Sequence, residues 1–135
     1  MIQVGIIGSG FIGPAHIEAL RRLGGVNVVA LCDSSLAVAQ ERADALHIPH
    51  AYGSVEALLA HPGLQVVHNC TPNYLHADIN RQILRAGLHV FSEKPLCMTP
   101  DEARELETLA QRAGVVHGVS FVYRQFAMVQ QAASM

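Results

Sequence analysis

The sequence predicts an α/β domain whose doubly wound, mainly parallel sheet is covered by helices on both faces. Two observations lead to this fold class. Short, almost wholly apolar runs alternate along the chain with segments in which apolar residues recur every three or four positions. Apolar runs without polar alternation are typical of strands in a parallel sheet that is buried on both sides. Strand and helix also follow each other through short connections, which indicates repeated βαβ units with right-handed crossovers.

Five apolar runs provide the expected strands. They are residues 2–7, 26–32, 64–70, 88–91 and 114–121. Helices are expected between them, at residues 12–23, 35–46, 54–60, 74–86 and 99–113. The first two helices each carry an apolar stripe with helical spacing, which predicts one face packed on the sheet. These stripes are Ile12, His16, Leu20 and Leu23 in the first helix, and Leu36, Ala39, Ala43 and Leu46 in the second.

Residues that favour helix ends mark the last two helices. Gly87 follows the fourth helix, where a left-handed residue commonly ends a helix. The fifth helix has the strongest start signal, because Thr99 is followed by Pro100 and then by Glu102. A threonine three positions before a glutamate is a capping box, and proline is favoured at the first helical position. Gly114 marks the end of this helix.

Length and composition restrict the class of protein. The 135 residues fit one domain and carry a net charge of −2, and the scattered charges argue against nucleic-acid partners and a membrane surface. No run approaches the ~18 consecutive apolar residues of a membrane span. The three cysteines, Cys32, Cys70 and Cys97, are far apart, which predicts reduced thiols in a cytoplasmic protein. No histidine or cysteine pair has the spacing of metal ligands, so we expect no metal site.

The segment between the first strand and the first helix has the spacing of a phosphate-binding turn. Gly8, Gly10 and Gly13 form a G-x-G-x-x-G motif that encloses Ser9, Phe11 and Ile12. In such a turn the first glycine permits a tight bend, the second lets a pyrophosphate approach the backbone, and the third lets the helix pack closely. We therefore expect a dinucleotide between residues 8 and 13, bound at the helix N-terminus.

An acidic residue completes this fingerprint. Asp33 ends the second strand, 20 residues after Gly13, where an acid accepts hydrogen bonds from the adenosine ribose. Ser34 and Ser35 follow it, without an arginine that could hold a 2′-phosphate. The sequence therefore favours NAD over NADP, although Asp33 could instead only cap the helix that follows.

Polar residues also follow the third expected strand. Thr71, Pro72, Asn73 and His76 lie where the carboxyl end of a parallel strand meets a ligand. We expect Thr71 to donate a hydrogen bond and Pro72 to fix the turn, whereas His76 should point back towards the strand ends. The alternative is that Thr71 and Asn73 only shape the turn and cap the helix.

The fourth strand ends in Glu93, Lys94 and Pro95, and Lys94 is the only lysine of the chain. A surface ion pair between Glu93 and Lys94 is the simplest explanation, although it would contribute only ~0–1 kcal/mol. The preceding apolar strand and the rigid proline favour a functional lysine instead. Of the remaining histidines, we expect His68 and His117 to satisfy hydrogen bonds in the core.

Taken together, these segments resemble the N-terminal domain of the Gfo/Idh/MocA oxidoreductases. The resemblance covers essentially the whole chain and rests on six stretches: GIIGSGFIG, ALCD, AYGSVEALL, TPNYLH, AGLHVFSEKPL and GVSFVYR. It implies hydride transfer between a nicotinamide cofactor and a hydroxyl carbon of a sugar, inositol or related polyol. It also implies that Lys94 orients the substrate, that Glu93 contacts the nicotinamide end or positions the lysine, and that the Lys94–Pro95 bond is often cis.

The resemblance further divides the chain. Residues 1–121 correspond to a dinucleotide-binding Rossmann domain, and residues 122–135 to the start of a connection into a C-terminal α/β substrate domain, which we expect to be missing here. An exposed docking face then predicts self-association as a homo-oligomer. Two alternatives stay open: a non-enzymatic dinucleotide-binding sensor or partner-binding module, and a Rossmann domain with another ligand and no redox role.

Overall fold

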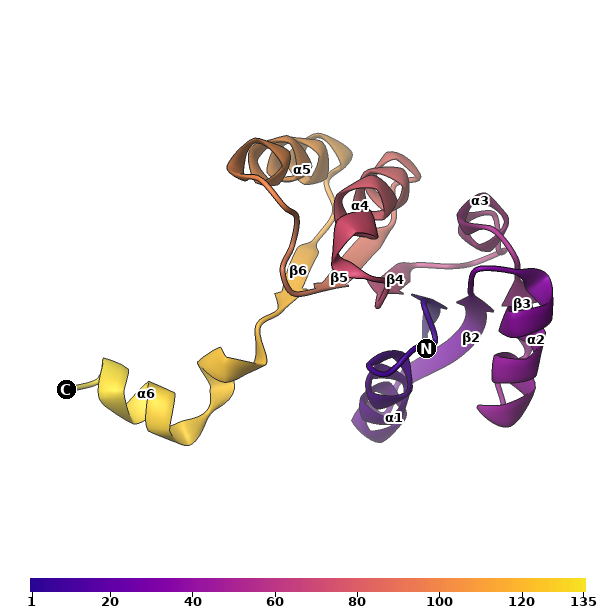
Figure 1. Cartoon of the computed structure of the whole chain (residues 1–135), viewed down its shortest axis with the longest axis horizontal. Helices are drawn as coiled ribbons and strands as arrows, with labels where there is room; N and C mark the ends of the chain where they lie inside the picture. Colours follow the sequence, from indigo (N-terminus) through magenta and orange to yellow (C-terminus); the bar gives the residue numbers. More distant parts are fainter.

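Six parallel strands form a single sheet, as the computed structural model of residues 1–135 shows (Figure 1). The strands are β1 (Ile2–Ile7), β2 (Val26–Cys32), β3 (His50–Tyr52), β4 (Val66–Asn69), β5 (His89–Glu93) and β6 (His117–Ser120). Their order across the sheet is β3-β2-β1-β4-β5-β6, and every neighbouring pair is parallel. Strands β2 and β3 are added on one side of β1, and β4 to β6 on the other, so the strand order reverses between β1 and β4. This is the position where doubly wound sheets bind ligands. The expected Rossmann fold class is confirmed.

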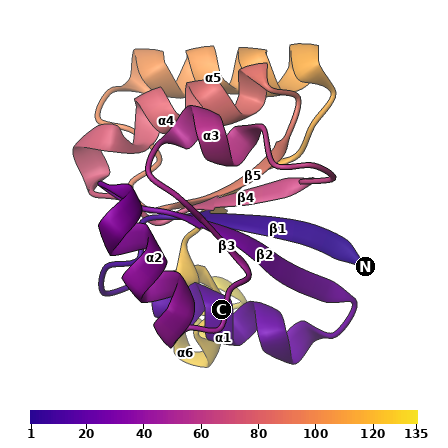
Figure 2. The same ribbon diagram turned by 90° about the vertical axis from the view of Figure 1, so that its right-hand side faces the viewer.

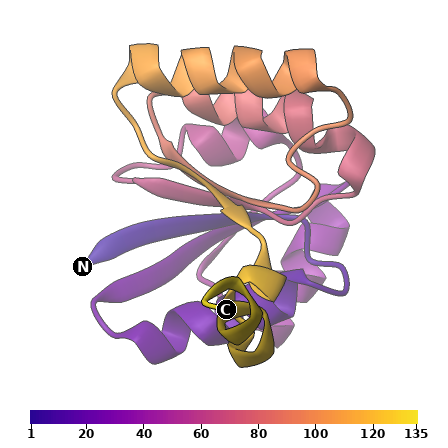
Figure 3. The same ribbon diagram turned by 90° about the vertical axis from the view of Figure 1, so that its left-hand side faces the viewer.

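Helices cover the two faces of this sheet. They are α1 (Gly13–Leu23), α2 (Leu36–Ala45), α3 (Val55–Leu59), α4 (His76–Arg85), α5 (Pro100–Ala113) and α6 (Ala127–Ala133), together with the 3₁₀ turns η1 (Asn73–Leu75) and η2 (Val122–Gln125). Figure 2 shows α3, α4 and α5 above the sheet, with α1 and α2 below it. The last residues leave β6, and α6 runs on the α1 side, away from the sheet (Figure 3).

Each face has its own hydrophobic core, because alternate strand residues point to opposite sides. On one face, Val67 and Val90 pack with Ile83 of α4 and Leu106 of α5. On the other, Ile6 packs with the inner residues of α1 and α2. The α1 face is incomplete over β4, β5 and β6, where a groove of about 770 Å³ remains. None of the helices is long and apolar enough to cross a lipid bilayer.

The structure corrects several expectations about the ends of elements. The three-residue strand β3 was not anticipated, because its sequence, His-Ala-Tyr, is too short to show a period. Asn73 does not cap α4: it begins the 3₁₀ turn, and Leu75 occupies the N-cap position without a side-chain hydrogen bond. Leu23 and Leu36, which were expected on buried stripes, are exposed: Leu23 ends α1 and lines the open groove, and Leu36 is the first residue of α2.

The expected capping box at α5 is confirmed. The Thr99 side chain accepts a hydrogen bond from the Glu102 backbone, and the Glu102 carboxylate accepts one from the Thr99 backbone. At the other end, Gly114 adopts the left-handed conformation with φ of 66°. These local signals fix both ends of α5, and therefore the start of β6 beside β5.

We predict that Thr99→Ala lowers the free energy of unfolding by about 1 kcal/mol, the usual contribution of an N-cap side chain. Urea denaturation measures this change. Thr108→Ala is the matched control, because Thr108 is an exposed threonine inside α5 whose hydroxyl bonds only the Arg104 carbonyl of the same helix. Equal losses for the two variants would contradict the capping role.

Candidate functional site

The turn between β1 and α1 contains three glycines. Two of them have no room for a side chain, and the third faces open space. Gly8 has φ of 91°, and a Cβ there would lie 2.7 Å from the Cys70 carbonyl oxygen. A Cβ on Gly13 would collide with the Gly8 carbonyl. A Cβ on Gly10, by contrast, would meet no atom within 4 Å. Gly8 and Gly13 therefore keep the turn tight, while Gly10 presents bare backbone to open space.

Asp33 joins this turn to the end of β2. Its Oδ2 atom accepts hydrogen bonds from the Ser9 hydroxyl and from the Ser9 backbone N–H, the latter at 2.8 Å, and Oδ1 accepts from the Ser34 N–H at 2.7 Å. Burial alone would raise the pKa of Asp33, but the hydrogen bonds from Ser9 and Ser34 outweigh it and lower the pKa below its ordinary value. The carboxylate is therefore charged at neutral pH. Since each carboxylate oxygen can accept about two hydrogen bonds, Oδ1 can still accept another.

These residues line a cavity of about 420 Å³. Its walls are Gly8, Gly10, Phe11, Ile12, Asp33, Cys70, Thr71 and Pro72. The first turn of α1 faces this end of the sheet, and no side chain caps its N-terminus. Its free N–H groups and the bare backbone at Gly10 are suited to a phosphate, and Asp33 is suited to hydroxyl groups. The residues present therefore fit a dinucleotide.

The loop after β4 is held from the α4 side. The Thr71 hydroxyl donates to Asn69 Oδ1 at 2.7 Å, and Asn69 in turn donates to Asn80 at 2.9 Å. Because the Thr71 hydroxyl proton is already donated to Asn69, Thr71 cannot donate a hydrogen bond to a ligand as expected. Its hydroxyl oxygen can still accept one. Asn73 is exposed and its side chain makes no hydrogen bond within the chain.

His76 points back towards the strand ends, as expected, but its ring is not open to a ligand. Its side chain is fully buried, and its two ring nitrogens lie 2.6 Å from the Pro95 carbonyl oxygen and 2.8 Å from that of Thr71. No edge of the ring remains for a cofactor, so the expected direct contact is corrected. His76 instead connects the loop after β4 to the loop after β5.

Glu93 is the last residue of β5, and its partner is not Lys94. Glu93 Oε1 lies 3.0 Å from His16 Nε2, and Oε2 accepts the Lys94 backbone N–H at 3.1 Å. Burial would raise the pKa of Glu93, but hydrogen bonds from His16, Ser120 and the Lys94 backbone lower it below its ordinary value. Lys94 itself is exposed, forms no ion pair, and precedes a cis peptide bond to Pro95, as the family resemblance implied.

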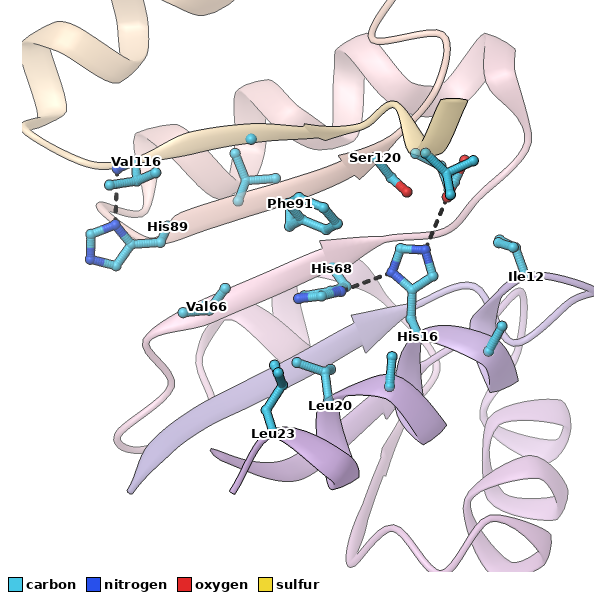
Figure 4. Close-up of a pocket in the computed structure, with 16 residues that line it drawn as sticks. Ile12, His16, Leu20, Leu23, Val66, His68, His89, Phe91, Val116 and Ser120 are labelled. Carbon is cyan, nitrogen blue, oxygen red and sulfur yellow. Dashed lines mark hydrogen bonds and ion pairs between the residues drawn. The ribbon is translucent and has the colours of Figure 1, made fainter. Parts of the chain in front are cut away.

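The histidines near this site were only partly anticipated. His68 of β4 does make the expected core hydrogen bond, with its Nδ1 atom 2.9 Å from His16 Nδ1 (Figure 4). Burial, followed by the charge of His16, lowers the pKa of His68 to about 4. His117 differs from expectation, because its buried Nε2 atom has no partner. The pairing of His16 with His68 was not predicted. Its only signal in the sequence was a histidine in the apolar stripe of a helix and another in an apolar strand.

The cysteines near the cavity are protonated thiols. Burial, followed by the charge of Asp33, raises the pKa of Cys32 to about 11, and burial followed by Glu93 raises that of Cys70 to about 12. Neither thiol is an activated nucleophile. The structure contains no group of three or more histidine, cysteine or acidic side chains that could hold a metal ion.

The carboxyl ends of four strands thus bring together the glycine turn, Asp33, Thr71 and the segment from Glu93 to Pro95. A profile described as an oxidoreductase family with an NAD-binding Rossmann fold matches residues 2–121. The chain belongs to the Gfo/Idh/MocA oxidoreductase family. This membership shows that residues 2–121 form an NAD(P)-binding Rossmann domain.

Known proteins are similar to this Gfo/Idh/MocA domain over nearly its whole length. The D-xylose 1-dehydrogenase (NADP(+)) 2 of Haloferax volcanii is 37% identical over 134 residues, or 99% of the chain. The crystal structure of an NAD binding oxidoreductase from Klebsiella pneumoniae has a TM-score of 0.91 and 34% identity over 98% of the chain. Levoglucosan dehydrogenase, in complex with NADH and levoglucosan, has a TM-score of 0.83 and 29% identity over 91% of the chain.

The chain spans less than half of each of these proteins. It corresponds to 41% of the xylose dehydrogenase, 37% of the Klebsiella oxidoreductase and 35% of levoglucosan dehydrogenase. One relative is named for NADP and another is solved with NADH. The comparisons therefore establish the family and the NAD(P)-binding domain, and they do not choose between the two cofactors.

We predict that His68 makes the stability of the fold pH-dependent. Because its pKa in the folded protein, about 4, lies below the ordinary histidine value of 6.5, the unfolded chain takes up the proton first as the pH falls. The free energy of unfolding should therefore decrease from pH 6.5 towards pH 4. Urea denaturation across this window should give a flatter profile for His68→Gln, and parallel profiles for the two proteins would contradict the assignment.

Proposed function

We propose that the chain is the NAD(P)-binding part of an oxidoreductase that transfers hydride between a nicotinamide cofactor and a hydroxyl carbon of a sugar, inositol or related polyol. The observation that supports this most strongly is the arrangement of the strand ends. The glycine turn and Asp33 lie at the ends of β1 and β2, and the Glu93-Lys94-Pro95 segment follows β5 at the same edge. That edge presents its groups in the order that a dinucleotide requires.

The first half of the site would bind the adenosine and the pyrophosphate. The backbone from Gly10 through Phe11 and Ile12 to Gly13, with the N-terminus of α1, would receive the phosphates. Asp33 would accept the adenosine ribose hydroxyls, with Ser34 beside it. A charged carboxylate there would repel a 2′-phosphate, and no arginine neighbours it in the sequence. We therefore assign NAD as the preferred cofactor.

The second half would receive the nicotinamide end and the substrate. Thr71, Pro72 and Asn73 would border it on the β4 side, and Glu93 and Lys94 on the β5 side. A bound nicotinamide cofactor supplies the hydride acceptor or donor of the reaction. The exposed ammonium of Lys94 is a compact donor that can hold a substrate hydroxyl or carbonyl oxygen, and arginine would not present its charge in this way.

The substrate class follows from the relatives. Their names include a D-xylose dehydrogenase and a levoglucosan dehydrogenase, so a small molecule with several hydroxyl groups is proposed here as well. A homo-oligomer is proposed on the basis of the exposed apolar side chains of the last residues, Phe126, Met128 and Val129.

We predict that the chain binds NADH more tightly than NADPH in calorimetric titrations, and that Asp33→Ala weakens NADH binding by about tenfold, the effect of losing a charge-assisted hydrogen bond. Because Asp33 also holds the turn through Ser9, Ser9→Ala is the matched control. It removes the Ser9 hydroxyl bond but keeps the ribose acceptor, and should retain most of the affinity. A preference for NADPH would overturn the cofactor assignment.

A second prediction concerns the open position in the turn. Gly10→Ala should leave the free energy of unfolding within about 0.5 kcal/mol of the wild type, because its Cβ meets no protein atom. The same Cβ would occupy the space proposed for the pyrophosphate, so NADH affinity should fall by at least about tenfold. Unchanged affinity in the calorimeter, with a normally folded variant, would show that no phosphate approaches Gly10.

A further inference from the structure

Three buried polar side chains from three elements meet on the α1 face of the sheet. His16 of α1 lies between His68 of β4 and Glu93 of β5, and Figure 4 shows His16 and His68 side by side below Phe91 and Ser120. Their exposed fractions are 9%, 8% and 8%. They border the apolar groove, where isolated polar groups would be costly. This cluster is not used by the glycine turn or by Asp33.

His16 is the main side chain that stabilises the buried charge of Glu93, and Ser120 is a second one. An ionised carboxylate in an apolar setting requires charged or hydrogen-bonding partners. The ammonium of Lys94, the only lysine, does not serve, since only the backbone N–H of this residue contacts the carboxylate. The 3.0 Å contact from His16 Nε2 to Glu93 Oε1 therefore requires a proton on Nε2, because a carboxylate can only accept.

His68 fixes the ring of His16 from its other edge. His68 is neutral, because burial keeps its pKa near 4, so it carries one ring proton. If His16 is neutral, its Nδ1 accepts from His68 Nδ1–H. If His16 is doubly protonated, its Nδ1–H donates to His68 Nδ1. Both arrangements keep the 2.9 Å contact and leave Nε2 of His16 directed at Glu93.

The cluster also connects the two halves of the site. Ile12, one turn before His16, lines both the small cavity at the glycine turn and the apolar groove. At the other end of the cluster, the Glu93 carboxylate accepts the Lys94 N–H. The chain of contacts thus runs from the helix that faces the proposed phosphate site to the backbone of Lys94.

We propose that His16, held by His68, is a positioning residue that fixes the Glu93 carboxylate and the Lys94 backbone in register with the glycine turn. The nicotinamide end of a dinucleotide then meets a preformed surface. This inference rests on the proposed function. His16 itself touches neither phosphate nor substrate; it acts through Glu93. The other titratable group close to Glu93 is the protonated thiol of Cys70, whose pKa burial raises to about 12, and His89 lies farther along β5, bonded to the Val116 N–H.

The test compares two ligands that share one half. ADP-ribose has the adenosine, pyrophosphate and second ribose of NADH but no nicotinamide. Calorimetric titration of the 135-residue chain at pH 7 should give measurable binding of both. His16→Phe should lower the affinity for NADH by about tenfold, the loss expected when a hydrogen bond to a charged group is removed. The affinity for ADP-ribose should change by less than about twofold.

Two further variants separate positioning from folding. His16→Gln carries an amide N–H that reaches the position of Nε2, and it should restore NADH affinity to within about threefold of the wild type. In a Glu93→Gln background, His16→Phe should have little further effect on the ratio of the two affinities. If His16→Phe does not fold, His16→Leu, which is smaller and also lacks the donor, takes its place in both comparisons.

The outcomes distinguish this inference from the function on which it rests. Equal losses for NADH and ADP-ribose, or failure of His16→Gln to restore NADH binding, would overturn the positioning role while leaving the dinucleotide site intact. A wild-type chain that binds neither ligand would overturn the proposed function itself, and the positioning role with it. A selective loss for NADH that is rescued by glutamine supports both.

Discussion

The common direction of all six strands is the constraint on which the site depends. Because β1 lies between β2 and β4, the turn after β1 is bordered by Asp33 on one side and by the Cys70 carbonyl on the other. On the β4 side, the Cys70 carbonyl leaves no room for a Cβ at Gly8. On the β2 side, the Asp33 carboxylate accepts the Ser9 N–H. The turn is therefore shaped by its neighbours as much as by its own glycines, and its open side is the carboxyl edge of the sheet.

The alternation of strand side chains divides the buried polar groups into two networks. Asn69 and Ser92 point to the α4 side, where both bond Asn80. His68 and Glu93 point to the α1 side and meet at His16. Each network connects β4 with β5 through a helix, so the two loops after these strands are fixed from both faces. A site that must hold two ends of one long ligand benefits from this double support.

Much of the fold could be predicted because its signals are local. Strand β1 and helix α5 begin and end where apolar runs, the capping box and glycine place them. The remaining features depend on contacts distant in sequence. His16 was expected only as part of an apolar stripe, since its partners lie 52 and 77 residues away. The pairing of Glu93 with a histidine and not with its neighbour Lys94 could not be inferred from adjacency, because successive residues at the end of a strand point in different directions.

The central claim is that a dinucleotide lies along the carboxyl edge of the sheet, from Asp33 to Lys94. The most direct test is to follow the backbone amide resonances of the isotopically labelled chain during addition of NADH. We expect shifts at Gly10, Ser34, Thr71 and Lys94, with residues that line the groove, such as Val66 and Gly118, nearly unchanged. Shifts centred on the groove, or no shifts at the glycine turn, would contradict it.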